Sequence, residues 1–416
     1  MITSGYNILF WIIITIIAIE AIIDFILDKR NSKSWLQPIP TILDDVYDVE
    51  KYKKAQNYHA EREKLSSIST VFSIVLTLVF LFIKGFAHVQ LWVEAQTSNE
   101  ILQVLLFFGV FMIASDFISL PFQLYSTFVI EEKYGFNKMS LKTFIIDKLK
   151  GYFISAIIGG ILLSLFVLFY QYAGKLFWLY AWILFSAFSI FMVMFYTSWI
   201  VPIFNKLQPL EAGSLREKIE AFAKTVDFPL TNIMVIDGSK RSTKANAYFS
   251  GLGSKKTIVL YDTLIKDHTV EELVAILAHE VGHYKLKHIQ KSIIISVVQM
   301  GIILYILSLA ISLPQLTQSL GYASDKPVFV LGLIAFSLLY SPISTVVEIF
   351  MNVFSRKNEF EADNYAKEKT GTGQFLIDAL KKLSSNNLSN LNPDKWYVFF
   401  NYSHPPLKER ITALLK

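Results

Sequence analysis

The 416-residue chain contains no cysteine, which excludes a disulfide framework and a thiolate nucleophile. Any metal must therefore be held by histidine, aspartate or glutamate, and the chain has only seven histidines. Charged residues are scarce too, at 18% against about 25% in a typical globular protein. Because 53% of the residues are hydrophobic, the composition indicates a membrane protein. The net charge of +5 fits basic cytoplasmic loops and gives no reason to expect a nucleic-acid partner.

Seven stretches are apolar enough to cross a bilayer, which needs about 20 helical residues. The first lacks the basic region and cleavage site of a signal peptide, so we expect it to be a retained span. The last contains Pro342 and Glu348, which predict a kink or a partial exit from the bilayer. The predicted spans are Ile8–Leu27, Ile68–Phe86, Ile101–Phe122, Phe153–Tyr172, Phe177–Pro202, Ile293–Leu313 and Val328–Phe354.

Basic residues alternate between successive loops. The first, third and fifth loops and the C-terminal tail are rich in lysine and arginine, whereas the second loop, near Ala87–Glu100, has none. The fourth and sixth loops hold only Lys175 and Lys326. The positive-inside rule then predicts a multi-pass membrane protein with an external N-terminus and both long polar regions in the cytoplasm.

The predicted architecture is an α-helical membrane protein that carries a cytoplasmic α+β domain. We divide it into residues 1–204 with five spans, 205–290 as a peptidase domain, 291–354 with two more spans, and 355–416 as a cytoplasmic C-terminal segment. In the peptidase domain, Thr269 with Glu272 three residues later predicts a capping box that starts a helix. Before it we expect a helix over Ser214–Thr225, an apolar run over Asn232–Asp237, and a hairpin of Ala247–Phe249 and Thr257–Tyr261 around Gly251, Gly253 and Ser254.

The segment Ala278–His283 carries the strongest chemical signal. His279 and His283 are four residues apart on the predicted helix, so both imidazoles project from one face and can reach one zinc ion. Glu280 lies beside them, where it can act as a general base on a water molecule. Histidines on an apolar helix are more often packed core residues, but the pair with its adjacent glutamate favours a metal site.

Glu359 is the predicted third ligand, since a catalytic zinc ion usually takes three protein ligands. Asp363 follows one helical turn later and could hydrogen-bond to a ligand histidine, which would fix its tautomer. Glu361 faces another side of the helix and is a weaker candidate. His288, five residues after His283, is expected to point elsewhere. His59, His88 and His268 lack any supporting context and are expected to be structural or surface residues.

Two further segments have both a functional and a plain interpretation. His404 and Arg410 flank a Pro-Pro pair before the last predicted helix, and either could stabilise an oxyanion. The plain alternative is a helix start with surface charges. The segment from Asn246 to Phe249 could be an edge strand that pairs with an extended peptide substrate, or an ordinary hairpin strand.

Ionisable residues within the spans leave another class of protein open. Asp116 and Glu348 could form a polar pathway in a seven-helix transporter or receptor. A membrane protease of the heat-shock, quality-control type is a second alternative. We assign no role to Asp116 or Glu348.

Taken together, these motifs resemble those of the integral-membrane CAAX prenyl protease family of zinc endopeptidases. The resemblance also includes Glu-Glu-Lys-Tyr-Gly-Phe-Asn-Lys at Glu131–Lys138 and Val-Pro-Ile-Phe-Asn at Val201–Asn205. It implies seven helices around a water-filled chamber, with the zinc site on the cytoplasmic side. Family members remove the last three residues of prenylated C-a-a-X proteins. The implied partners are therefore a peptide or protein substrate, including one with a prenylated C-terminus, and the lipid bilayer.

The resemblance also assigns roles to residues. It implies that His279, His283 and Glu359 bind Zn²⁺, that Glu280 is the base, and that His404 and Arg410 contact the substrate and transition state. It further implies that Asn246, Ala247 and Tyr248 belong to a substrate-binding edge strand. The absence of cysteine and the abundance of isoleucine and lysine favour a bacterial inner membrane over the endoplasmic reticulum. Since bacteria generally lack protein prenylation, membrane-protein quality control would be an alternative use of the same chemistry.

Overall fold

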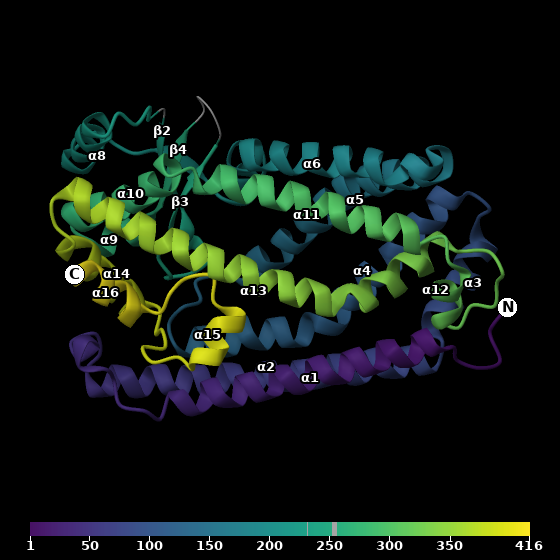
Figure 1. The fold of residues 1–416 in the computed structure, drawn as a ribbon. Helices are drawn as coiled ribbons and strands as arrows, with labels where there is room; N and C mark the ends of the chain where they lie inside the picture. Colours follow the sequence, from purple (N-terminus) through teal and green to yellow (C-terminus); the bar gives the residue numbers. More distant parts are fainter. Residues whose placement is uncertain (231, 252–255) are drawn as a thin grey trace.

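The computed structural model describes residues 1–230, 232–251 and 256–416 and is dominated by helices (Figure 1). Two π-helical segments extend longer helices: Ser126–Glu131 continues α4, and Tyr196–Ile200 joins α6 to α7. The helices are α1 (Ile8–Ser34), α2 (Val49–Phe82), α3 (Gly85–Gln96), α4 (Glu100–Tyr125), α5 (Leu141–Tyr172), α6 (Phe177–Phe195), α7 (Val201–Phe204), α8 (Ser214–Thr225), α9 (Asp262–Asp267), α10 (Val270–Lys285), α11 (His288–Ala310), α12 (Pro314–Ser319), α13 (Phe329–Thr370), α14 (Gln374–Asn386), α15 (Lys395–Asn401) and α16 (Leu407–Leu415).

Seven helices in the described part of the chain are long and apolar enough to cross a membrane, which confirms the predicted number of spans. The second differs most from its prediction. Helix α2 begins at Val49, where Asp48 caps it by accepting a hydrogen bond of 2.7 Å from the Lys51 amide, and it ends at Phe82. Lys84 then adopts a left-handed conformation and begins α3, where only a loop was expected. Hydropathy detected the apolar half of α2 and missed its polar half.

The seventh span belongs to the longest helix. Helix α13 runs without a break from Phe329 through Pro342 to Thr370. The boundary proposed between residues 354 and 355 therefore lies inside a helix, and the boundary at 290 lies just inside α11. Because α13 carries Glu359 beyond its apolar part, the predicted third ligand is joined rigidly to the last span.

A four-stranded sheet lies at one end of the molecule, beside α8 and α10 (Figure 1). The strand order is β1-β2-β4-β3, with β2 parallel to β4 and the two outer pairs antiparallel. The predicted hairpin is thus confirmed as β3 and β4, although its Gly253 and Ser254 lie outside the described residues. Strand β3 forms one edge of this sheet, and β1 forms the other. The strands are β1 (Leu207–Pro209), β2 (Asn232–Ile236), β3 (Ala247–Ser250) and β4 (Thr257–Tyr261).

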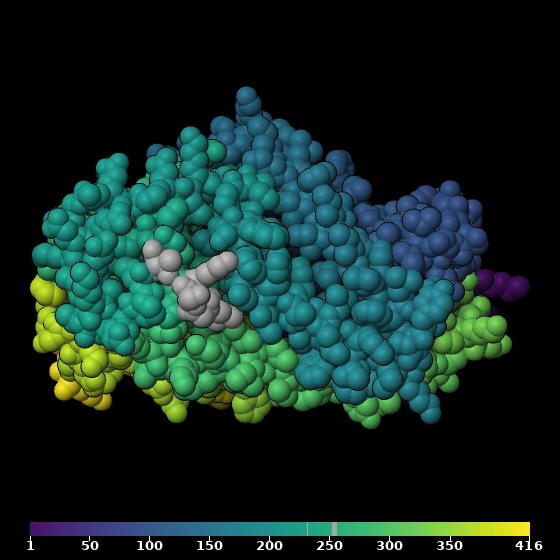
Figure 2. Space-filling model, turned by 90° about the horizontal axis from the view of Figure 1, so that it is seen from above, coloured from purple at the N-terminus to yellow at the C-terminus, as the bar shows by residue number. Residues whose placement is uncertain are grey.

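Two large buried clusters organise the packing, and a small third one joins Val201 to Ile236 and Val259 of the sheet. The first joins Leu43 and Tyr58 of the N-terminal polar region to Ile219, Leu260 and Leu277 of the peptidase domain. The second lies among the spans and contains Phe10, Phe107 and Leu331. The molecule is elongated, with the N-terminus at one end and the C-terminal residues at the other (Figure 2). The polar regions therefore share one hydrophobic core, separate from that of the spans.

Helix α10 begins with the predicted capping box. Thr269 Oγ1 accepts a hydrogen bond of 3.2 Å from the Glu272 amide, and Glu272 Oε2 accepts one of 3.0 Å from the Thr269 amide. Lys382 of α14 pairs with the same carboxylate at 2.7 Å. These contacts satisfy helix-end amides that would otherwise lack partners.

We expect Thr269→Ala to destabilise this end of the protein by about 1 kcal/mol, the usual cost of losing a helix cap. The melting temperature of the detergent-solubilised protein should fall by about 2 °C, as measured by intrinsic fluorescence. Thr412→Ala is the matched control, since its hydroxyl contacts only the Lys408 carbonyl of its own helix. Equal melting temperatures for the Thr269 variant and the parent protein would contradict this account.

Candidate metal centre

Close packing of two helices creates the site. Helix α10 carries His279 and His283, while α13 carries Glu359. The helices lie close together at Gly282, where a Cβ atom would lie 3.2 Å from both Cα and the carbonyl oxygen of Ala362. Any larger residue at position 282 would push the helices apart. The glycine between the two histidines therefore allows the glutamate to reach them.

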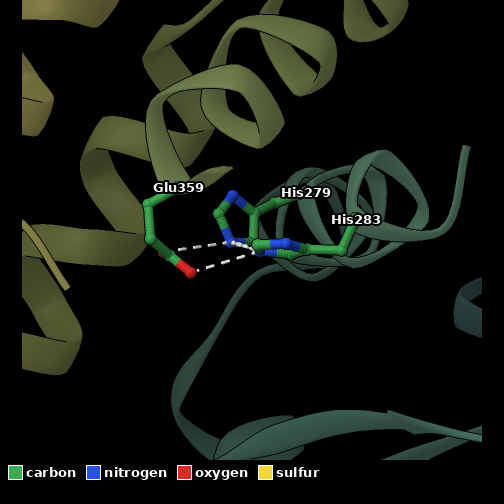
Figure 3. A group of neighbouring side chains, drawn as sticks. All are labelled: His279, His283 and Glu359. Atoms are coloured by element: carbon green, nitrogen blue, oxygen red, sulfur yellow. Dashed lines mark hydrogen bonds and ion pairs between the residues drawn. The ribbon is translucent and has the colours of Figure 1, made fainter. Parts of the chain in front are cut away.

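The three predicted ligands converge from these two helices (Figure 3). His279 Nε2 and His283 Nε2 are 3.1 Å apart. Glu359 Oε2 lies 3.5 Å from the first and Oε1 lies 3.2 Å from the second. Donor atoms bound to a tetrahedral zinc ion at about 2.0–2.1 Å lie roughly 3.3 Å from one another, so the triangle fits zinc. Glu359 Oε2 is also buried and accepts no hydrogen bond from any described residue.

Asp363 and Arg410 support the first histidine. Asp363 Oδ1 lies 2.8 Å from His279 Nδ1, as its spacing from Glu359 predicted. Arg410 donates to both oxygens of Asp363, at 2.8 and 2.6 Å, and only 9% of its surface is exposed. The arginine is thus committed to a bidentate pair, which orients Asp363 and, through it, His279.

His404 stands in contrast to Arg410. It lies in the loop before α16, and 65% of its side chain is exposed. Its Nε2 lies 3.4 Å from Glu359 Oε1, and Nδ1 lies 3.0 Å from the Ser403 hydroxyl. The ring borders the metal-binding group and is far more exposed than the side chain of Arg410, of which 11% is exposed.

A cavity of about 450 Å³ brings the predicted residues together. Glu280 lines it beside the two histidines, and burial raises the pKa of its carboxyl above the usual range. Such a shift suits a group that must accept and then release a proton. Asp363 lies behind the cavity wall. The predicted site residues on the wall are Asn246, Ala247, Tyr248, His279, Glu280, His283, Glu359, His404 and Arg410.

His288 and Glu361 belong to the site although the sequence interpretation set both aside. His288 Nδ1 lies 3.1 Å from His283 Nδ1, and its Nε2 lies 3.1 Å from Glu361 Oε2. With His283 Nε2 turned to the metal-binding group, the proton is assigned to Nδ1, which donates to His288. His288 then donates from Nε2 to Glu361. The expectation failed because Lys287 is left-handed and ends α10, so helical spacing does not extend to residue 288.

The other singled-out residues lie apart from the site. His59 and His268 donate hydrogen bonds to the main-chain carbonyls of Leu388 at 2.8 Å and Leu264 at 3.1 Å, and His88 donates one to the Lys84 carbonyl. Asp116 is bonded to Lys148 and Tyr152 of α5. Glu348 is exposed on α13. None of them belongs to the group that could hold a metal in the described part of the chain.

The fold and the site together define a metallopeptidase of the membrane-embedded class. A family model for the CAAX prenyl protease N-terminal region, with five membrane helices, matches residues 29–206, and one for peptidase family M48 matches residues 209–416. The chain belongs to peptidase family M48 and, within it, to the CAAX prenyl proteases. It is a membrane metalloendopeptidase, and its family is generally zinc-dependent.

Curated relatives and a solved structure extend over nearly the whole chain. The CAAX prenyl protease 1 homolog of Oryza sativa is 38% identical, with 93% of each chain covered. The CAAX prenyl protease 1 of Saccharomyces cerevisiae is 35% identical, and the human homolog is 33% identical; each match covers 90% of this chain and 88% of the relative. The crystal structure of S. mikatae Ste24p has a TM-score of 0.93 at 33% identity, covering 99% of this chain and 100% of that one.

We expect His288→Ala to weaken zinc binding by about tenfold or more, because loss of a group that orients a ligand histidine typically has this effect. Zinc retained at increasing chelator concentration, measured by atomic absorption, reports the affinity without an activity assay. His268→Ala is the matched control, as this buried histidine contacts a carbonyl away from the site. Zinc retention equal to that of the parent would show that His288 does not support His283.

Proposed function

We propose that this protein binds one zinc ion per chain and cuts peptide bonds near the C-terminus of membrane-associated, prenylated substrates. The observation that supports it most is a single cavity that holds three converging ligands, a glutamate base and a free strand edge. The relatives named above are CAAX prenyl protease 1 proteins, which supports the substrate class. We also propose that the seven spans surround a water-filled chamber, as the resemblance to the family implies.

His279, His283 and Glu359 would hold the zinc ion. When bound, the zinc ion would act as a Lewis acid that polarises the scissile carbonyl and activates water. Glu280, one residue after the first ligand, takes a proton from the attacking water. The same carboxyl then gives that proton to the departing amine, which balances the hydrolysis.

His404 is the proposed donor to the oxyanion. Its exposed ring can turn to the substrate carbonyl from the side of Glu359. Arg410 acts through Asp363 as a positioning residue, since its Nε and Nη2 both donate to that carboxylate and its third nitrogen, Nη1, faces Glu359 Oε2 at 3.5 Å. The geometry therefore favours His404 of the two residues left open by the sequence.

Strand β3 is the proposed binding edge for the substrate. Among the described residues, β3 pairs only with β4, so its outer main-chain groups are available. Asn246, Ala247 and Tyr248 lie in the same cavity wall as Glu280. An extended peptide that adds to this edge gains main-chain hydrogen bonds whatever its side chains.

The catalytic side is proposed to face the cytoplasm, with the N-terminus outside. Support comes from the alternation of basic and neutral loops. Composition favours a bacterial inner membrane over the endoplasmic reticulum, whereas the relatives named above are eukaryotic. The catalytic proposal holds for either membrane.

Glu280→Gln should abolish cleavage of a synthetic farnesylated C-a-a-X peptide while the zinc content stays near one per chain. The amide keeps the shape of the side chain but cannot accept the proton of water. Peptide products are measured by mass spectrometry and zinc by atomic absorption, with Glu220→Gln as a matched control that should keep most activity, since Glu220 pairs with Arg216 on the exposed face of α8. Full cleavage by the Glu280 variant would refute the mechanism, and equal rates on the unprenylated peptide would refute the prenyl preference.

Single cysteines can map the orientation because the chain has none of its own. Ser98→Cys lies between α3 and α4, and Ser214→Cys is the first residue of α8; both positions are exposed. A membrane-impermeant maleimide added to intact cells should label position 98 at once and position 214 only after permeabilisation. The reverse pattern would place the site on the opposite side of the membrane.

A further inference from the structure

Strand β3 is short and paired on one side. It has four residues, and the segment that leads into it from β2, residues 237–246, contains only one turn of 3-10 helix. We call residues 237–246 the approach segment. Short edge strands gain little rigidity from their own pairing. If β3 is to hold a substrate at a fixed distance from the metal, something else must fix its position.

The first part of the approach segment is held by the ends of two spans. Asn205, which follows α7, donates a hydrogen bond of 3.0 Å to Asp237 Oδ1, and the Lys206 amide donates to the same oxygen at 2.8 Å. Arg241 makes a bidentate pair with Asp147 near the start of α5, at 2.8 and 3.0 Å. Charged, bidentate contacts of this kind fix geometry as well as adding energy.

The middle of the approach segment pairs with the third loop. The Lys138 amide donates to the Arg241 carbonyl at 3.0 Å, and the Thr243 amide donates to the Phe136 carbonyl at 3.0 Å. An isolated antiparallel bridge lies between them. The loop between the third and fourth spans thus acts as a short partner strand for the approach segment.

The last part is anchored by a buried tyrosine and an ion pair. Lys244 Nζ lies 2.9 Å from Glu131 Oε2 and 3.0 Å from Tyr58 Oη. Tyr58, 1% exposed on α2, donates to Glu131 Oε1 at 2.6 Å. The ammonium also lies 4.5 Å from the centre of the Phe136 ring. Lys244 is two residues before Asn246, so this anchor is set immediately before the proposed substrate strand.

The far end of β3 has its own contact. Ser250 accepts a hydrogen bond of 2.7 Å from Thr197, a buried residue of the π-helical segment between α6 and α7. The strand is therefore tied at both ends to helices that cross the membrane. Its position relative to α10 depends on how those helices are placed.

We propose that Glu131, Lys244 and Tyr58 are positioning residues that set strand β3 against the metal site. This assigns a role to the segments Glu131–Lys138 and Val201–Asn205, which the catalytic proposal leaves without one. The inference rests on the proposed function in one respect, that β3 binds the substrate. The ends of the spans then control substrate binding rather than the chemical step.

The test uses Lys244→Met and Glu131→Gln in the full-length protein. Methionine keeps an apolar chain against Phe136 and removes the charge together with its hydrogen bonds to Tyr58 and Glu131. KM for the farnesylated C-a-a-X peptide should rise about three- to tenfold with kcat changed less than about twofold, as expected when only binding is lost. The double variant should resemble the single variants, because all three remove the same pair.

Lys133→Met is the matched control. Lys133 is in the same loop and pairs with Glu61 on an exposed surface, so its loss should leave KM unchanged. A fall in kcat, zinc content and melting temperature together in the Lys244 variant would show a merely structural role and overturn the proposal. An unchanged KM would overturn it as well.

A second measurement does not depend on any peptide being cleaved. Hydrogen exchange followed by mass spectrometry should show faster exchange in residues 245–250 of Lys244→Met, with residues 270–285 of α10 unchanged. If no peptide is cleaved by the parent protein, the proposed function fails while this readout still tests the positioning. Equal exchange of residues 245–250 in the variant and the parent would refute the positioning role.

Discussion

The site depends on the close contact between α10 and α13. Two histidines four residues apart place two ligands on one face of α10. The third ligand comes from α13, so the two helices must lie close enough for all three side chains to reach one metal ion. Gly282 provides that distance, because the position where its Cβ would be is 3.2 Å from the Ala362 backbone. The hydrophobic faces of both helices are buried beside this point, in the core shared with α14 and α16. Packing in the peptidase core therefore sets the ligand distances.

Charge explains why the surrounding groups are so closely paired. Three acidic side chains, those of Glu280, Glu359 and Asp363, meet one guanidinium, that of Arg410, so the site has an excess of negative charge when the acids are ionised. A divalent cation balances this charge. Without one, carboxylates held in low dielectric are costly to keep ionised. Removing Arg410 would leave Asp363 buried without its partner, a change that costs about 3–5 kcal/mol in comparable pairs.

The sequence predicted the parts of this protein that depend on local periodicity. The seven spans, the Thr269 cap, the β3–β4 hairpin and the ligand spacing all follow from patterns within a few residues. It missed what depends on breaks in those patterns. His288 reaches His283 only because Lys287 reverses the backbone, and α3 begins at the left-handed Lys84. The different exposure and pairing of His404 and Arg410 also needed the structure, since both are tertiary properties.

The length of α13 relates the site to the bilayer. Its apolar part was predicted to end at Phe354, and Glu359 follows five residues later, about 7 Å further along a helix. A peptide bond one to three residues from a lipid-anchored cysteine lies within about 10 Å of the anchor in an extended chain. If the apolar part of α13 ends at the bilayer surface, a ligand held about one turn and a half beyond it would be at the height of such a bond. A substrate that approaches from solution does not need a metal site so close to the membrane surface. This favours a membrane-anchored C-terminus as the proposed substrate.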